Sequence, residues 1–195
     1  MIIKTKDTKT PSKKDKTKRR PPKKITQTYL HNAGLYYLGR FAASSQRFRE
    51  IMTRKIKKSC AVHEDQNIEE CYALLESLIT DFQRSGLLND ETYAASKVKT
   101  MRRQGKSRRA ITSYLNGKGI EPEIQITTLH KADTAFETSE KDAEHAAAMI
   151  YAKKRKIGPF RTKTELSHEK ELAALARAGF SYEIASNVLK ASKDT

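Results

Sequence analysis

Residues 115–124 read Leu-Asn-Gly-Lys-Gly-Ile-Glu-Pro-Glu-Ile, and residues 175–184 read Leu-Ala-Arg-Ala-Gly-Phe-Ser-Tyr-Glu-Ile. Both stretches are typical of a helix that ends in a Schellman cap, in which a glycine just past the last turn takes the left-handed conformation. The apolar residue after this glycine folds back onto the leucine before it, and the acidic or serine residues that follow start a new helix. Each stretch therefore predicts a helix, a tight turn and a second helix.

The two stretches are copies of one another. A shift of residues 115–129 by 60 positions aligns six of them with similar residues, Gly119 with Gly179 among them. A third copy of the glycine pattern occurs at residues 82–87. Any two helical hairpins with glycine caps would share part of this pattern, but matches in one fixed register favour an internal repeat. Because no alternating run indicates a strand, the sequence predicts an all-α, modular protein.

Composition narrows the class of protein further. The chain has 195 residues and a formal net charge of +16, with 37% hydrophobic and 32% charged residues, which suits small helical units better than one thick core. No apolar run approaches the roughly 20 residues of a membrane helix, and no secretory signal begins the chain, so we expect a cytoplasmic protein without a membrane partner. Two cysteines are too few for a disulfide framework, and Cys60 and His63 have no second ligand pair at zinc-site spacing.

The chain divides into four segments. Residues 1–24 carry 11 Lys/Arg, three prolines and no aromatic residue, and we expect a disordered basic tail there. A first helical repeat is predicted over residues 25–62, a second, three-helix repeat over residues 63–131, and a third, also of three helices, over residues 132–195.

Apolar periodicity and capping residues place the individual helices. The first apolar stretch, residues 30–41, is expected to be interrupted at Gly34 and Gly39, and residues 68–82 form the clearest amphipathic helix. The serines at 44, 45 and 107 are expected to cap helices, and Pro122 to stand at a first helical position. Further helices are expected over residues 90–103, from 107 to 119, from 121 onward, from 133 to 156, over 164–177 and over 182–191.

No catalytic constellation is found in the sequence. A phosphate-binding loop would need glycines ahead of Lys163-Thr164, where Ile157 and Thr162 stand instead. The five histidines are scattered, and each is more typical of a solvated or packed side chain than of a general base. We therefore expect neither enzymatic activity nor a cofactor or metal.

Positive charge is concentrated in three clusters at helix ends and turns. Residues 97–109 hold seven basic residues and no acid, residues 153–163 are similarly crowded, and residues 47–58 form the third cluster. One cluster would be a solvated face with favourable charge at a helix C-terminus, but three on repeated units favour contact with a polyanion or an acidic protein surface. The candidate contact residues are Arg102, Arg103, Lys106, Arg108, Arg109, Lys153, Lys154, Arg155, Lys156, Arg161, Arg47, Arg49, Arg54 and Lys55.

Short motifs follow one another in a fixed order along the chain. They include Tyr37-Leu38-x-Arg40-Phe41-Ala42, Gly86-Leu87-Leu88-Asn89-Asp90, Gly105-Lys106-Ser107-Arg108-Arg109-Ala110-Ile111, Arg155-x-x-Gly158-Pro159-Phe160 and Leu175-x-Arg177-x-Gly179-Phe180-Ser181-Tyr182. In order and spacing, from about residue 28 to residue 192, they resemble the RecX family of regulators of the RecA recombinase. Asn89 stands where that family more often has aspartate, and the two are nearly equivalent as helix caps.

The resemblance implies three tandem three-helix repeats in an elongated, curved arrangement, with the tail at residues 1–24 outside the shared region. It implies a non-enzymatic modulator that lodges in RecA filaments on single-stranded DNA, inhibits ATP hydrolysis and strand exchange, and tunes recombination, DNA repair and the SOS response. We expect a monomer with weak, non-specific contact to single-stranded DNA. A sequence-specific helix-turn-helix transcription regulator remains an alternative, against which the lack of an obvious base-reading helix counts. A basic, chaperone-like RNA-binding protein is a third.

Overall fold

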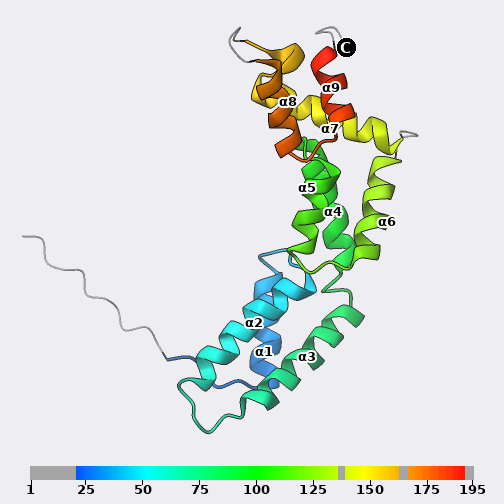
Figure 1. Ribbon diagram of the computed structural model, residues 1–195. Coiled ribbons are helices and arrows are strands. Elements are labelled where there is room, and N and C mark those ends of the chain that lie inside the picture. The colour runs from blue at the N-terminus through cyan, green and yellow to red at the C-terminus, as the bar shows by residue number, and fades with distance from the viewer. Residues whose placement is uncertain (1–20, 136–138, 163–166, 192–195) are drawn as a thin grey trace, which may run out of the picture.

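The computed structural model describes residues 21–135, 139–162 and 167–191, and within these ranges all regular secondary structure is helical. Its helices form three blocks that follow one another along an elongated, curved molecule (Figure 1). The first block holds α1 (Gln27–Leu38), α2 (Ser45–Cys60) and α3 (Ile68–Arg84); the second holds α4 (Asp90–Arg103), α5 (Arg108–Asn116) and α6 (Pro122–Asp133); the third holds α7 (Glu140–Arg155), the 3-10 turn η1 (Gly158–Phe160), α8 (His168–Arg177) and α9 (Tyr182–Lys190). The predicted all-α fold of three-helix repeats is thereby confirmed.

Local sequence explains where the helices begin. Every α-helix of the described ranges except α6 has a Ser, Thr or Asn N-cap whose side chain accepts a hydrogen bond from the first turn. Helix α6 instead has Pro122 in its first turn, where a missing N–H costs nothing. Ser44 and Ser107 cap α2 and α5 as predicted.

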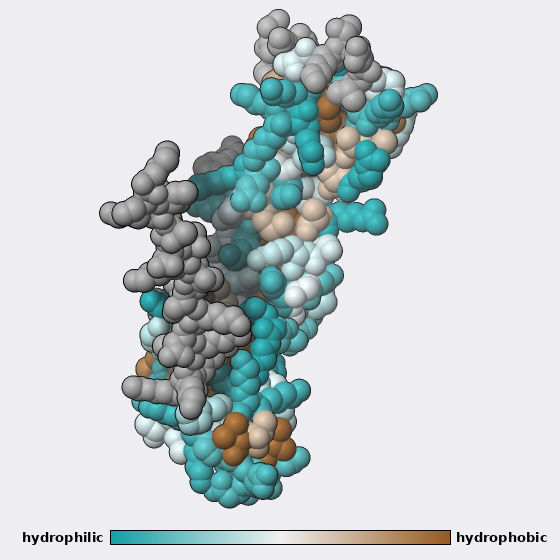
Figure 2. Space-filling view, turned by 90° about the vertical axis from the view of Figure 1, so that its left-hand side faces the viewer, coloured by the Kyte–Doolittle hydropathy of each residue, from teal (hydrophilic) through white to brown (hydrophobic). Residues whose placement is uncertain are grey.

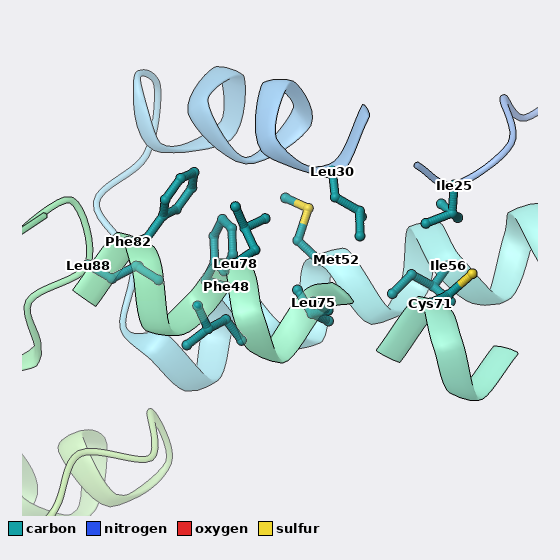
Figure 3. Packing of buried hydrophobic residues seen from close by; sticks show 11 residues of the cluster. Ile25, Leu30, Phe48, Met52, Ile56, Cys71, Leu75, Leu78, Phe82 and Leu88 are labelled. Atoms are coloured by element: carbon teal, nitrogen blue, oxygen red, sulfur yellow. The ribbon is translucent and has the colours of Figure 1, made fainter. Parts of the chain in front are cut away.

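The first block is built around a single core to which all three of its helices contribute (Figure 3). Its buried members are Ile25, Leu30, Phe48, Met52, Ile56, Cys71, Leu75, Leu78, Ile79, Phe82 and Leu88. The core therefore groups residues 25–88, whereas the sequence placed residues 63–88 with the second repeat. The polar loop after residue 61 joins two packed helices, and the boundary between blocks lies near residue 88.

Gly34 does not interrupt α1, contrary to the sequence-based expectation. The helix runs through this position, and a Cβ built on Gly34 would stand 2.8 Å from Phe82 Cε2 and 3.0 Å from Phe48 Cζ. Glycine is needed here because the two rings of the core press against the helix backbone. The glycine thus permits close packing and does not end the helix.

The part of the predicted tail that the structure describes, residues 21–24, runs along the first block. The carbonyl oxygen of Pro22 accepts a hydrogen bond from His63 Nε2 at 2.9 Å, and that of Lys23 accepts one from Ser59 Oγ at 2.8 Å. Ile25, which follows, is 4% exposed. Residues 1–20 lie outside the described ranges.

The second and third blocks have smaller, separate cores. The second is centred on Ala94, Val98, Ile111, Leu115 and Leu129, all 2% exposed or less. In the third, the small side chains of Ala147, Ala148 and Ala152 on α7 let α8 and α9 approach closely. On the face shown in Figure 2, hydrophilic side chains predominate and hydrophobic ones form small, scattered groups. Small cores under a polar surface are what the composition predicted.

The glycine pattern at residues 82–87 differs in role from the other two copies. Gly119 and Gly179 lie between two helices of one block, whereas Gly86 lies between α3 and α4 and so connects two blocks. Leu88, not Leu87, donates its N–H to the carbonyl of Phe82, and Leu87 stays 49% exposed. The sequence copy at 82–87 is therefore a connector, and only the other two copies are structurally equivalent.

Neighbouring blocks meet at two joints of the same design. In the first joint, Ser44 Oγ caps α2 and also donates to the carbonyl of Lys118, just before Gly119, at 2.7 Å. In the second joint, Ser107 Oγ caps α5 and donates to the carbonyl of Ala178, just before Gly179, at 2.7 Å. Both serines are fully buried. The helix-capping serine of one block thus also fixes the glycine turn of the next.

Replacing Gly119 with valine is expected to destabilise the first joint by about 2–4 kcal/mol. The backbone there has φ +68°, which a β-branched residue resists, and a Cβ would lie 2.6 Å from the Cβ of Gln46. Urea unfolding followed by circular dichroism measures the loss. Gly117→Val is the matched control, because Gly117 has φ −65° and its nearest neighbour would be 3.5 Å from the new Cβ. Equal losses in the two variants would contradict the assigned cap.

Candidate functional site

Two of the basic clusters come together at the second joint. The turn between α4 and α5 packs on α7 so closely that a Cβ on Gly105 would lie 2.7 Å from the backbone nitrogen of Tyr151. Lys154, in the last turn of α7, donates its Nζ to the carbonyl of Gln104 at 3.0 Å. Segments about 50 residues apart in sequence therefore form one surface, which we call the basic turn surface. It carries the exposed cations Arg103, Lys106, Lys153 and Lys154.

The position of these cations follows from helix electrostatics. Arg102 and Arg103 stand in the last turn of α4, and Lys153, Lys154 and Arg155 in the last turn of α7. Positive side chains are favourable there because unpaired carbonyls give a helix C-terminus a partial negative charge. The C-termini of α4 and α7 lie together in the structure. The basic side chains there that have no acidic partner are therefore exposed on one surface.

Arg102 does not belong to that exposed surface. Its guanidinium forms hydrogen bonds to both carboxylate oxygens of Asp133, at 2.9 and 2.6 Å, and to Glu144 Oε2 at 2.5 Å. The side chains of Arg102 and Asp133 are only 13% and 1% exposed. Burial disfavours the charged guanidinium, but the hydrogen bonds with Asp133 and Glu144 prevail and raise the pKa of Arg102. Arg102 therefore ties α4 to α6 and α7, which corrects its proposed role as a contact residue.

Arg108 is also engaged inside the joint. Its Nη1 lies 2.9 Å from Glu140 Oε2 and 3.5 Å from Asp133 Oδ2, although no described residue offers it a well-aligned hydrogen bond. The backbone N–H of Arg108 donates to the Glu144 carboxylate at 3.0 Å. Three acidic residues on α6 and α7 thus form ion pairs with Arg102 and Arg108, two of the arginines that the sequence predicted as contact residues.

Three more candidate arginines have internal partners. Arg49 forms two hydrogen bonds of 2.8 Å with Glu76, and Arg47 pairs with Glu50 at 2.8 Å. Arg161 pairs with the buried carboxylate of Glu171, and this hydrogen bonding holds the pKa of Glu171 below its ordinary value. These pairs compensate charge within the fold, so their cations offer less to an outside partner.

The remaining candidates are dispersed. Arg54 and Lys55 lie on α2 in the first block, away from the basic turn surface (Figure 1). Arg155 stands 5.8 Å above the ring of Tyr151, and Lys156 closes α7 in a left-handed conformation at φ 55°. Arg109 lines a cavity of about 750 Å³ at the second joint. The structure thus brings the clusters of residues 97–109 and 153–163 together in part and leaves the α2 cluster, residues 47–58, separate.

The residues that sequence reasoning missed are the buried acids. Asp133 is 3% exposed and Glu171 is 1% exposed, and each neutralises an arginine. In the sequence, residues 133–148 indicated only an acidic helix start. No local pattern marks an acid as buried, since its partner arrives from another helix.

Within the described residues, no helix is long and apolar enough to cross a membrane.

Comparisons of the sequence and of the structure with known proteins point to one family. A family model described as RecX, second three-helix domain, matches residues 89–128, which span most of the second block. The regulatory protein RecX of Myxococcus xanthus is 40% identical over 182 residues, covering 92% of this chain and 94% of its own. The regulatory protein RecX of Agrobacterium fabrum is 30% identical, covering 83% and 82% of the two chains. The crystal structure of RecX from Lactobacillus salivarius has the same fold, with a TM-score of 0.59 at 23% identity over 84% of this chain and 94% of that one.

Proposed function

Since this chain belongs to the RecX family of regulatory proteins, we propose that it binds filaments of the RecA recombinase on single-stranded DNA and restrains their ATP hydrolysis and strand exchange. The effect is one of contact and needs no bond-making by this chain. An elongated stack of blocks suits this role, because each block touches mainly its neighbours and the whole offers a long, shallow surface to a filament.

One observation supports a specific place for the contact. At the second joint, Arg102 and Arg108 form ion pairs with acidic residues of α6 and α7. The other basic side chains of the basic turn surface have no carboxylate partner in the described part of the chain; they are Arg103, Lys106, Lys153 and Lys154. Uncompensated cations on a rigid turn attract phosphates or an acidic surface at low desolvation cost. The basic turn surface is therefore the contact that we propose.

The variant R103A/K106A/K154A tests this contact. We expect it to raise the concentration that half-inhibits RecA ATPase on single-stranded DNA by about tenfold at low salt, and by less at high salt, because the lost contacts are electrostatic. Circular dichroism should show unchanged helicity, since none of the three side chains has a carboxylate partner among the described residues and the Lys154–Gln104 hydrogen bond that K154A removes is an exposed contact beyond the end of α4.

The matched control is R84A/R177A/K190A, which removes the same net charge from exposed helix ends elsewhere. It should inhibit like the unchanged protein. If both triple variants lose inhibition equally, net charge and not this surface governs binding. If the unchanged protein leaves RecA turnover untouched at low salt, or prefers one duplex sequence strongly over others, the proposed function is refuted.

A further inference from the structure

Aromatic and basic side chains are paired in a recurring way in this chain. Each cation–π contact of the described residues joins a tyrosine to the basic residue four positions later, on the next turn of the helix or just past its end. The pairs are Tyr36–Arg40, Tyr93–Lys97, Tyr114–Lys118 and Tyr151–Arg155, with the cation 5.0, 5.4, 5.4 and 5.8 Å from the ring centre. Such pairs stabilise a helix modestly. For the buried tyrosines, this stabilisation together with their packing explains the pairing.

Three of the four tyrosines are at least partly buried, and Tyr36 is the exception. Tyr93 is 8% exposed and its hydroxyl lies 3.3 Å from that of Tyr114, while Tyr151 packs against Phe180. Tyr36 is 67% exposed at the end of α1, and Phe41, just beyond, is 56% exposed. Packing within the block therefore leaves both residues more than half exposed.

The exposed rings are held in place and not merely extended into solvent. Arg40 Nη1 donates to the Tyr36 hydroxyl at 2.6 Å while its guanidinium covers the ring at 5.0 Å. Phe41 packs against Tyr37 with 5.4 Å between ring centres, and Tyr37 in turn faces the core residue Phe48. A partner that stacks on these rings would lose little entropy in ordering them.

The cluster also lies beside the first joint, where the chain of Lys118 meets Ser44. Ser44, three residues after Phe41, donates its hydroxyl to the carbonyl of Lys118. The end of α5, with the Tyr114–Lys118 pair, is thereby fixed next to the turn that carries Arg40 and Phe41. Flat rings next to positive charge match a ligand that combines π faces with phosphates.

We propose that Tyr36, Arg40 and Phe41 form a stacking site for unpaired bases of single-stranded DNA. The two rings and the guanidinium plane receive base faces, and Lys118 attracts the adjoining phosphates. This site lies at the first joint, whereas the basic turn surface lies at the second, so a strand is held at two separate places. This proposal rests on the proposed function only in that both involve single-stranded DNA. The stacking site itself binds DNA in the absence of RecA.

The test compares two labelled strands, oligo-dT and an abasic strand of equal length, with this chain alone and no RecA. The unchanged protein should bind oligo-dT at least about fivefold more tightly than the abasic strand, since one stacked base contributes about 1–3 kcal/mol. Y36A/F41A should lose this preference while the dependence of affinity on salt keeps its slope. R103A/K106A/K154A should show the opposite pattern, a shallower slope with the preference retained.

Y182A is the matched control, because Tyr182 is 74% exposed on α9 and far along the chain from the cluster. It should retain the preference, and Y36F should retain it as well. The abasic comparison on the unchanged protein keeps the test decisive even if Y36A/F41A folds poorly. Equal binding of both strands by the unchanged protein overturns the site. So does a Y36A/F41A variant that keeps the preference, or one that binds DNA normally and loses only RecA inhibition, which would identify a protein contact.

Discussion

Replacing Arg102 with alanine is expected to lower the free energy of unfolding by about 3–5 kcal/mol. The substitution leaves the carboxylates of Asp133 and Glu144 without their hydrogen-bonded cation, and the side chain of Asp133 is 1% exposed. Removing one member of a buried pair costs more than the pair contributes, because an uncompensated charge stays in a poorly solvated place. Urea unfolding followed by circular dichroism at neutral pH measures the loss.

Arg103→Ala is the control for this prediction, since it removes the same side chain one position later, where it is exposed. We expect that variant to stay within about 0.5 kcal/mol of the unchanged protein. Arg102→Ala should also weaken RecA inhibition indirectly, because Arg102 Nη1 holds the Lys106 carbonyl at 3.2 Å within the basic turn. A stability loss no larger than that of Arg103→Ala would show that Arg102 is not part of a buried network.

Replacing Gly105 with alanine is expected to cost about 2–5 kcal/mol, the sum of a left-handed backbone and a steric overlap. The residue has φ +75°, and the new Cβ would stand 2.7 Å from the nitrogen of Tyr151 and 2.9 Å from the carbonyl oxygen of Ala147. Both neighbours are backbone atoms of α7, which cannot rotate away as a side chain would. The turn and α7 must separate, and the second joint opens.

Gly86→Ala isolates the two parts of this cost. Gly86 has φ +77°, nearly the same conformation, but a Cβ there would meet no atom of the described ranges within 4 Å. We therefore expect Gly86→Ala to cost only the backbone part, about 1–2 kcal/mol. The difference in unfolding free energy between the variants measures the packing at the joint. If the two losses agree within error, α7 does not press on this turn.

The role of a cation in this protein is decided by the acids that surround it. Arg102 and Arg103 are neighbours in sequence and identical in chemistry, yet one is buried against Asp133 and the other is exposed. The density of basic residues along the sequence identifies the segment 97–109 that contains both arginines, but it does not show which of them is buried. The distinction depends on α6 and α7, which bring the carboxylates of Asp133 and Glu144 to Arg102.

The block boundaries show a similar division. Residues 68–82 were recognised as an amphipathic helix from their period alone, and α3 covers them. An apolar stripe tells that a helix face will be buried, but it does not tell against which partner. From the sequence, the polar loop before α3 is therefore predicted to be a boundary between repeats. In the structure, Leu75, Ile79 and Phe82 pack with α1 and α2, and residues 25–88 form one unit.

By itself, the sequence determined the helices, their capping serines and asparagines, the left-handed glycines at 119 and 179, and the overall excess of positive charge. These features act within about one helical turn, so the residues that cause them stand next to one another in the chain. Only the tertiary structure decided which arginines are compensated, that the turn at Gly105 lies against α7, and that Tyr36 and Phe41 stay exposed beside the first joint. The contacts that decide them include Arg102–Glu144, Lys154–Gln104 and Ser44–Lys118, which join residues 42, 50 and 74 positions apart, and no short-range sequence pattern predicts such contacts.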